Sequence, residues 1–392
     1  MNKACTPPRI MMIAGEASGD LHGGNLAEAL LQMDSSLQIV GIGGSEMRRA
    51  GVDVRFDSAR LGIVGFSEVI SKWGTIWEGY QTAKKILQEG CDLLVIIDFP
   101  DFNLRVAKFA KTLNIPVVYY IGPQLWAWRK GRIKTIAKRV DKMLVIFPFE
   151  ESFYRNANVP CEFVGHPLLD EAERVLEAPF SKDHYLGELG LSPAMATLGL
   201  LPGSRKTEIE RLLPVMLKTA EQLSQQGMPL QILIPIASTL SQAFVAHFTR
   251  ECSLPIRFVI GEIYSVLRAS DAVIAASGTV TLQAALTQTP MVVIYKMSYM
   301  TYRLARLLID LPSVSLVNIV AEKAIVPELI QDEATPDKIC RKIKTILSDR
   351  VRYDKMRDDL GDVSEKLGIG GASHRAAVVI CQMLHSDKSA QK

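Results

Sequence analysis

The chain has 392 residues and a formal net charge of +3, from 45 Lys and Arg against 42 Asp and Glu. So balanced a charge implies no polyanionic partner and argues against a nucleic-acid-binding protein. A single hydrophobic core seldom grows past roughly 250 to 300 residues, so the length predicts two domains. Scattered cysteines without metal-binding spacing, and no apolar run of roughly 18 residues, lead us to expect a soluble cytoplasmic protein.

The first predicted strand, residues 10–13, runs into a glycine-rich loop and then a helix. A strand followed by such a loop is typical of a Rossmann-like domain. The spacing is not GxGxxG, however, and no acidic residue ends the second strand, which argues against a nicotinamide cofactor. Four polar side chains crowd this loop and either cap the helix or line a substrate pocket: Glu16, Ser18, Asp20 and His22.

Residues 60–87 are rich in Leu, Ile, Val, Phe and Trp. This pattern fits either a pair of core helices or an apolar surface that receives acyl chains or touches a bilayer. A basic run over residues 129–142, opposed only by Asp141, is similarly ambiguous. It is either a solvated helix face or a contact with anionic headgroups.

Asp98 follows an apolar strand, residues 93–97, at the carboxyl end where catalytic groups of parallel sheets usually lie. Burial at such a place raises the pKa of a carboxylate and lets it act as a general base towards a hydroxyl. Asp101 and Asn103 are explained equally well as caps of the next helix. His166, between Gly165 and Pro167, fits a structural role better than a catalytic one.

The second half of the chain opens with an apolar strand that runs into Pro202, Gly203, Ser204 and Arg205 and then an amphipathic helix. The N–H groups at a helix start suit a phosphate, although an ordinary turn is the alternative.

The segment 277–279, Ser-Gly-Thr, repeats this arrangement after another strand. Both turns would lie at the carboxyl ends of parallel strands, which predicts one crevice for a phosphate-bearing ligand. Further on, Asn318 would either contact a diphosphate or sugar or cap an acidic helix predicted over residues 322–331.

A series of short segments spread over nearly the whole chain matches one known family in order: AGEASGD at Ala14, IDFPDFN at Ile97, QLWAWR at Gln124, FPFE at Phe147, FVGHP at Phe163, LPGSR at Leu201, ASGT at Ala276 and PMVVIYKM at Pro290. On these segments the chain resembles the lipid-A-disaccharide synthase family of GT-B glycosyltransferases. The resemblance implies an α/β fold with two Rossmann-like domains that face a central cleft, the last helix packing back on the first domain.

The resemblance also implies a reaction. It is the transfer of 2,3-diacylglucosamine from UDP-2,3-diacylglucosamine to 2,3-diacylglucosamine 1-phosphate, which gives a β-1,6-linked disaccharide 1-phosphate and UDP. Such enzymes invert the anomeric centre and need neither a metal nor another cofactor. Substrates with acyl chains imply a peripheral protein on the cytoplasmic face of the inner membrane. Whether it is a monomer or a homodimer stays open.

On this resemblance, Asp98 is the general base and Glu16 a second catalytic group. The UDP-sugar side comprises Ser204, Arg205, Glu262, Ser277, Gly278, Thr279, Gln283 and Asn318. The acceptor side comprises Ser18, Asp20, His22, Phe66 and Trp128. We expect an acceptor domain over residues 1–170, completed by about 352–386, a UDP-sugar-binding domain over 171–351, and a disordered tail over 387–392.

Two residues depart from the family pattern, because Gln283 stands where Glu is usual and Val317 where Pro is usual. Gln still donates and accepts hydrogen bonds, so we expect its contact to persist. Two other readings remain. A UDP-N-acetylglucosamine epimerase would need no apolar acceptor surface, so the Trp-rich stretch argues against it. An inactive nucleotide-binding paralogue is disfavoured by the retention of Asp98 and Arg205.

Overall fold

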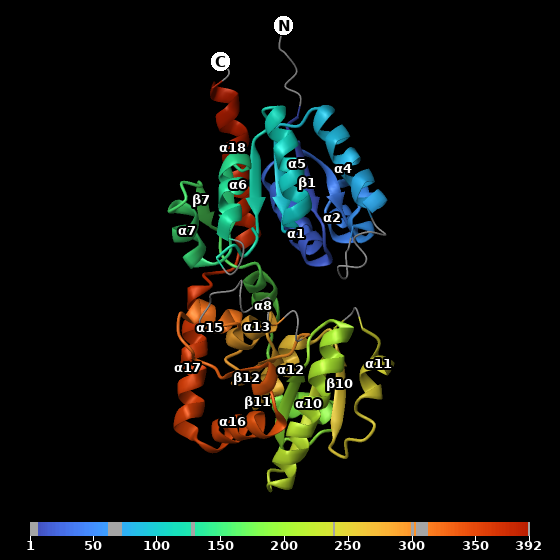
Figure 1. The fold of residues 1–392 in the computed structure, drawn as a ribbon, viewed down its shortest axis with the longest axis vertical. Helices are drawn as coiled ribbons and strands as arrows, with labels where there is room; N and C mark the ends of the chain where they lie inside the picture. The colour runs from blue at the N-terminus through green and yellow to red at the C-terminus, as the bar shows by residue number, and fades with distance from the viewer. Residues whose placement is uncertain are drawn as a thin grey trace. The chain divides into compact units, whose positions relative to one another are not determined.

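The computed structural model describes residues 7–61, 73–126, 130–237, 240–298, 302 and 313–390. The chain divides into two compact units, Met1–Leu169 with Ile369–Lys392 and Asp170–Gly368 (Figure 1). Each unit is built on one parallel sheet with helices packed against it. The structure thus confirms the predicted α/β class with two Rossmann-like units.

The sheet of the first unit has the strand order β3-β2-β1-β4-β5-β6-β7, with every pair parallel. Its strands are β1 (Arg9–Ala14), β2 (Gln38–Gly43), β3 (Asp53–Asp57), β4 (Leu93–Ile97), β5 (Val117–Tyr120), β6 (Lys142–Val145) and β7 (Cys161–Phe163). The order reverses between β1 and β4, which is the switch point where ligands bind in doubly wound sheets.

Helices cover both faces of this sheet: α1 (Ala17–Met33), α2 (Ser45–Arg49), α4 (Trp73–Gln88), α5 (Pro100–Thr112), α6 (Ile133–Arg139), α7 (Pro148–Arg155) and α18 (Ala372–Ala390), with short 3-10 turns at Ser58–Arg60 and Lys130–Arg132. Successive side chains of a strand point to opposite faces. Met11 and Ile13 therefore join the core under α4 to α7. Ile10 and Met12 join the core under α1, α2 and α18.

The last helix belongs to the first unit, as predicted. Ala376, Ala377 and Ile380 of α18 are fully buried in the core that α1 shares. Arg375 fixes the start of the helix, because its Nε donates to the carbonyl of Val164 at 2.8 Å. The helix runs to Ala390, into the segment 387–392 for which the sequence predicts disorder.

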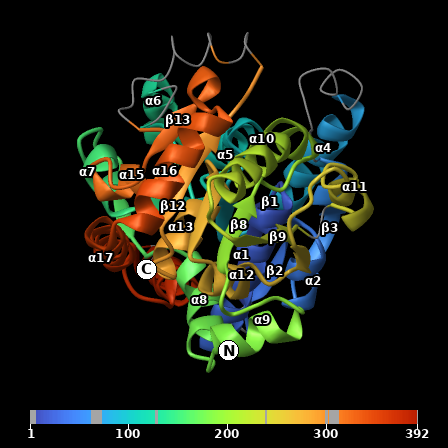
Figure 2. The ribbon, with the colours of Figure 1, turned by 90° about the horizontal axis from the view of Figure 1, so that it is seen from below.

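The sheet of the second unit has the strand order β10-β9-β8-β11-β12-β13, again with parallel pairs. Figure 2 labels β8, β9, β12 and β13 of this sheet. Its strands are β8 (Ala196–Leu201), β9 (Leu230–Ile236), β10 (Ile256–Ile260), β11 (Ala272–Ala276), β12 (Met291–Tyr295) and β13 (Glu328–Ile330). Its helices are α9 (Lys182–Glu188), α10 (Lys206–Gln225), α11 (Gln242–His247), α12 (Ile263–Ala269), α13 (Val280–Leu286), α15 (Leu316–Ala321), α16 (Pro336–Ser348) and α17 (Arg350–Lys366), with a 3-10 turn at Gln331–Glu333 and with α8 (Leu168–Leu176) before them. The switch point lies between β8 and β11.

The acidic helix predicted over residues 322–331 is wrong. The helix α15 comes earlier and ends at Ala321, because the φ of 59° at its C-cap residue Glu322 is left-handed and cannot continue a helix. Pro327 lacks the N–H that a helix interior needs. The residues that follow pair with β12 as the short edge strand β13 instead. Over the described ranges, no helix is both long and apolar enough to cross a membrane.

Candidate active site

The switch point of the first unit brings Glu16 and Asp98 together. Glu16 follows β1 and is the N-cap residue of α1, while Asp98 follows the neighbouring strand β4. The side chains of both residues line one cavity of about 860 Å³. The two proposed catalytic carboxylates thus share one site, at the carboxyl ends of adjacent strands.

The turn that carries Asp98 is strained and internally braced. Asp98 and Phe99 both have positive φ values, 46° and 45°, a conformation uncommon for residues other than glycine. The carbonyl of Asp98 accepts hydrogen bonds from the Tyr119 hydroxyl at 2.9 Å and the Asn103 amide at 2.7 Å. Such strain persists only where the surroundings enforce it, and it clusters at functional sites. Asn103 and Tyr119 provide that enforcement here.

Gly15 lets the loop after β1 approach this turn. A Cβ atom at Gly15 would lie 2.3 Å from the ring of Phe99, a distance that no side chain tolerates. The Phe99 ring also packs against Phe102, with centroids 5.7 Å apart. The glycine therefore allows the two strand ends of the switch point to close on each other.

The environment of Asp98 favours a proton acceptor. Burial is the main cause that raises the pKa of its carboxyl, and the negative charge of Glu16 adds to this effect. A hydrogen bond from the backbone N–H of Phe99 opposes them only in part. A carboxylate with a raised pKa is a better base towards a hydroxyl.

The cavity beside Asp98 has an aromatic wall. Trp73 and Trp77 of α4 are 58% and 56% exposed, an unusual state for large aromatic side chains. The cavity is lined by Glu16, Trp73, Ile76, Trp77, Tyr80, Asp98, Phe99, Pro100, Asp101, Phe102, Arg105, Lys108 and Arg139. Its apolar wall offers an acyl chain a surface to bury against. Phe66 and Trp128, predicted on the acceptor side, and residues 62–72 lie outside the described residues.

The remaining polar residues of the first loop differ in their roles. Ser18 is exposed and His22 half-buried on α1. Asp20 is 5% exposed, and its carboxylate accepts the backbone N–H groups of Gly44, Glu46 and Met47 at 2.6, 2.9 and 3.2 Å. These bonds cap the start of α2, so both oxygens of the Asp20 carboxylate have a structural role. Glu16 and Ser18 are the exposed members of the set.

Two buried groups of this unit have structural roles, which the sequence predicts for His166 but not for Glu150. Glu150 accepts the indole N–H of Trp126 at 3.1 Å and caps α7, and burial raises its pKa to about 7. A Glu at the third position of a Pro-initiated helix signals such a cap. Burial, with a smaller effect of His22, lowers the pKa of His166 to about 3. His166 is therefore neutral, and its Nδ1 accepts the N–H of Leu168 at 3.1 Å, which is a structural role.

The switch point of the second unit brings the two glycine-containing turns to one sheet edge, because they follow the neighbouring strands β8 and β11. Gly203 has a φ of 109°, and a Cβ there would lie 2.1 Å from the Glu208 carboxylate. Glu208 accepts the N–H groups of Ser204 and Arg205 at 3.0 and 3.3 Å. The N–H groups expected to face a phosphate are thus held by Glu208, whereas the Arg205 side chain is 73% exposed.

The turn after β11 leaves an open surface. A Cβ at Gly278 would meet no atom within 4 Å, and Ser277 Oγ donates to the carbonyl of Val314 at 3.1 Å. Thr279 is exposed, and Gln283 lies one turn further along the same helix face, half-buried. Glu262 is exposed at the start of α12.

Asn318 is built into a loop rather than exposed on its surface. Its side chain is 2% exposed, and its amide oxygen accepts the N–H groups of Ile325 and Val326 at 2.9 and 3.0 Å. Its amide nitrogen donates to the Val326 carbonyl and to a Glu328 carboxylate oxygen at 3.0 and 2.7 Å. The amide has both donors and its oxygen engaged, so Asn318 fixes the shape of this loop.

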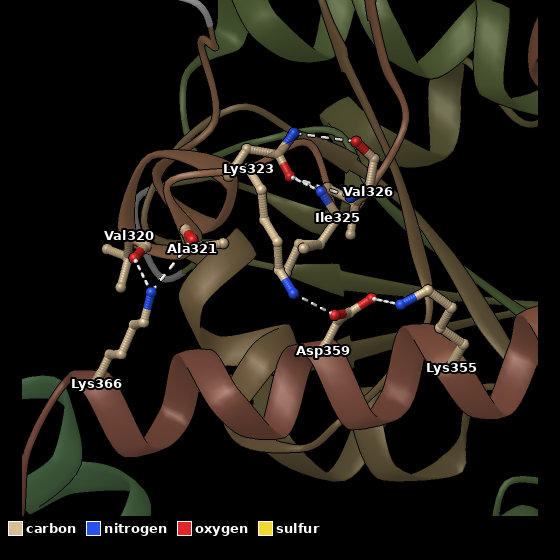
Figure 3. Close-up of polar contacts among 9 residues, drawn as sticks. Val320, Ala321, Lys323, Ile325, Val326, Lys355, Asp359 and Lys366 are labelled. Carbon is tan, nitrogen blue, oxygen red and sulfur yellow. Dashed lines mark hydrogen bonds and ion pairs between the residues drawn. The ribbon is translucent and has the colours of Figure 1, made fainter.

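Helix α17 clamps the same loop (Figure 3). Lys323 and Lys355 donate to the two carboxylate oxygens of Asp359 at 2.6 and 3.1 Å. Lys366 points its ammonium at the carbonyls of Val320 and Ala321 at the end of α15. Burial acts to raise the pKa of Asp359, but the ammonium groups of Lys323 and Lys355 outweigh it, and the net pKa is lowered. The Asp359 carboxylate is therefore charged at neutral pH.

The chain has the GT-B fold, which two-domain glycosyltransferases and related epimerases share. One solved structure of this fold is MurG from Acinetobacter baumannii, with a TM-score of 0.58, 16% identity and coverage of 96% of this chain and 100% of that chain. Another is UDP-GlcNAc 2-epimerase from Neisseria meningitidis bound to UDP-GlcNAc, with a TM-score of 0.64, 10% identity and coverage of 95% and 100%. At these identities the likeness concerns the fold alone.

Sequence comparison gives the family. The family described as Lipid-A-disaccharide synthetase matches residues 10–379. The lipid-A-disaccharide synthase of Geobacter metallireducens is 45% identical over 377 residues, which cover 96% of this chain and 97% of the relative. That of Myxococcus xanthus is 39% identical over 380 residues, with coverage of 96% and 98%. The chain belongs to the lipid-A-disaccharide synthase family, as its sequence segments predict.

Proposed function

We propose that the protein transfers 2,3-diacylglucosamine from its UDP carrier to the 6-hydroxyl of 2,3-diacylglucosamine 1-phosphate, with Asp98 as the general base. Its family makes the protein a hexosyltransferase that forms the lipid A disaccharide. The observation that carries the finer assignment is the position of Asp98. A carboxylate with a raised pKa stands at the switch point, on a braced turn, in a cavity with an exposed aromatic wall.

In the proposed step, the carboxylate of Asp98 takes the proton of the acceptor 6-hydroxyl as that oxygen attacks the anomeric carbon of the donor sugar. The new carbon–oxygen bond forms while the bond to the UDP oxygen breaks, which inverts the anomeric centre. The proton ends on Asp98 and the electron pair leaves with UDP. Glu16, in the same cavity, keeps the Asp98 pKa high and lies close enough to orient the hydroxyl.

On the donor side, we assign the departing diphosphate to Arg205, whose guanidinium offers a planar fork of donors to phosphate oxygens. Ser204, Ser277, Gly278 and Thr279 would line the rest of that pocket, with Glu262 and Gln283 towards the nucleoside. Support comes from the β8–β11 switch point, where Ser204, Arg205 and Thr279 are exposed and Ser277 and Gly278 are half-buried. Asn318 would contribute by shaping the loop that carries Val314, which contacts Ser277.

We further propose that the protein works on the cytoplasmic face of the inner membrane as a peripheral enzyme. Both substrates carry acyl chains and reside in a bilayer. The exposed Trp73 and Trp77 fit that setting, because indole side chains favour the boundary between water and lipid. The basic residues that follow position 128 would add attraction to anionic headgroups.

The test is release of UDP from UDP-2,3-diacylglucosamine by the purified full chain, in neutral detergent with EDTA, with and without 2,3-diacylglucosamine 1-phosphate. Release that requires the acceptor, together with a disaccharide 1-phosphate by mass, is the expected result. Release without the acceptor would point to a hydrolase or epimerase instead. No release from folded protein that still binds UDP would indicate an inactive nucleotide-binding protein.

A further inference from the structure

The cavity beside Asp98 has a cationic part as well as an aromatic wall. Arg105 and Lys108 of α5 and Arg139 of α6 line it. Residues three apart on a helix lie on one face, so Arg105 and Lys108 are neighbours. Arg139 Nη1 donates to the carbonyl of Leu104 at 3.0 Å, which holds the third cation next to Arg105. The three side chains form one cluster, hereafter the cationic cluster.

The fold does not use the charge of this cluster. Across the part of the chain that the structure describes, Arg105 and Lys108 are exposed and form neither an ion pair nor a hydrogen bond. The nearest acid on the same helix, Asp101, is paired with Arg132. Among the described residues, Arg139 is bonded only to a neutral carbonyl. Three positive charges therefore face a cavity whose remaining acids are the catalytic candidates Glu16 and Asp98.

We propose that the cationic cluster is the subsite for the anomeric phosphate of the acceptor sugar. This inference rests on the proposed function. A sugar phosphate carries nearly two negative charges at neutral pH, and Arg and Lys are the side chains that bind such groups most strongly. With a rise of 1.5 Å per residue, Arg105 lies about 8 Å along α5 from Pro100, the residue next to the Asp98 turn.

That separation matches the length of one hexose that lies with carbon 6 at one end and the anomeric carbon at the other. The acceptor hydroxyl at carbon 6 lies at Asp98, the anomeric phosphate at the far end of the ring meets the cluster, and the acyl chains lie against Trp73 and Trp77. The cluster therefore selects a phosphorylated acceptor and fixes which end of the sugar faces the base. The phosphate of a bilayer lipid has related chemistry, so the experiment separates the two sources.

The first measurement is steady-state kinetics in neutral detergent for Arg105→Ala, Lys108→Ala and the double variant. Each single loss of a charged contact should raise the KM for 2,3-diacylglucosamine 1-phosphate roughly tenfold or more. The KM for the UDP-sugar should stay within about twofold, and Arg105→Lys should recover part of the loss. The matched control is Lys218→Ala, which removes an exposed lysine of α10 in the other unit.

The decisive comparison uses 2,3-diacylglucosamine without the phosphate. This acceptor should be poor for the unaltered protein, and the double variant should use it no worse than the unaltered protein does. Equal losses with both acceptors would overturn the subsite. So would variants that keep their KM in detergent but bind less to phosphatidylglycerol vesicles, because the cluster would then serve the bilayer.

Equilibrium binding of the phosphorylated acceptor without donor keeps this inference separate from the reaction. If the unaltered protein binds it at least tenfold more tightly than the double variant but forms no disaccharide, the subsite stands and the proposed function fails. If disaccharide forms normally and the variants bind the acceptor equally well, the proposed function stands and the subsite fails.

Discussion

The two switch points of the molecule have the same place in their sheets and opposite characters. In the first unit, the turn with Asp98 is half-buried, strained and held by Tyr119 and Asn103 through the Asp98 carbonyl. In the second, the turn with Ser204 and Arg205 is exposed and capped by the side chain of Glu208. Proton transfer requires a carboxylate at a fixed position, whereas a flexible diphosphate is better met by a long cationic side chain on an open surface.

The largest expected effect comes from Asp98→Asn. The amide is nearly isosteric and tolerates the left-handed turn, but it cannot accept the proton. We expect kcat to fall by about 10²- to 10⁴-fold, the usual contribution of a general base. UDP affinity, measured by calorimetry, should stay unchanged because the proposed UDP site belongs to the second unit. A kcat within tenfold of the unaltered protein would rule out Asp98 as the base.

Arg205→Ala should have the next largest effect, and it concerns the switch point of the second unit. Loss of a charged hydrogen-bond donor should weaken UDP binding by roughly ten- to hundredfold. The same calorimetric titration of Lys218→Ala, an exposed cation on the same helix, serves as the control. Unchanged UDP affinity in Arg205→Ala would remove the guanidinium from the diphosphate site.

Gly15→Ala tests whether the rigidity of the first switch point matters. The added methyl would clash with the Phe99 ring, so we expect a loss of about 1 to 3 kcal/mol in the free energy of unfolding and a lower kcat. Gly187→Ala is the matched control, because a Cβ there meets no atom within 4 Å. Urea unfolding and kcat are measured for both, and equal stability of the two variants would show that the loop accommodates the methyl.

The smallest effect concerns pH. The base must be ionised, so the rate rises with pH as Asp98 loses its proton, and the charge of Glu16 raises the pKa of that carboxyl. Glu16→Gln removes this charge and should shift the acid limb of the pH profile of kcat/KM to lower pH. Glu28→Gln, which neutralises an exposed carboxylate further along α1, should leave the limb in place. A shift to higher pH would contradict the proposed interaction.

Continuous apolar runs made much of the fold predictable. The strands at residues 93–97 and 272–276 are fully buried on both faces, and such strands contain almost only apolar residues. The edge strands β3 and β7 have mixed, partly exposed residues and no apolar run, so nothing in the sequence separates them from loops. The acidic composition of residues 322–331 favours a helix, but Pro327 cannot donate a helical hydrogen bond and the left-handed φ of Glu322 ends the preceding helix.

The positions of Asp98, Ser204 and Arg205 were predictable because each of these residues follows the end of an apolar strand. The role of a residue was not predictable where its side chain bonds to distant backbone. Asp20 caps another helix, and Asn318 holds a loop, although both look like surface groups beside glycine or within a polar turn. Arg105 and Lys108 were also missed. They stand out because they form no ion pair with the described residues around them, and a sequence does not show which charged side chains lack such partners.

The return of the chain to its first unit has a consequence for biosynthesis. The core under α1 includes Ala376, Ile380 and Leu384, which the ribosome makes after the whole of the second unit. Domains generally fold as units during synthesis, starting at the N-terminus. Here the second unit is complete as soon as residue 368 has emerged, while the unit that begins the chain must wait for α18. The proposed general base, Asp98, is thus translated before the second unit but belongs to the unit that is finished after it.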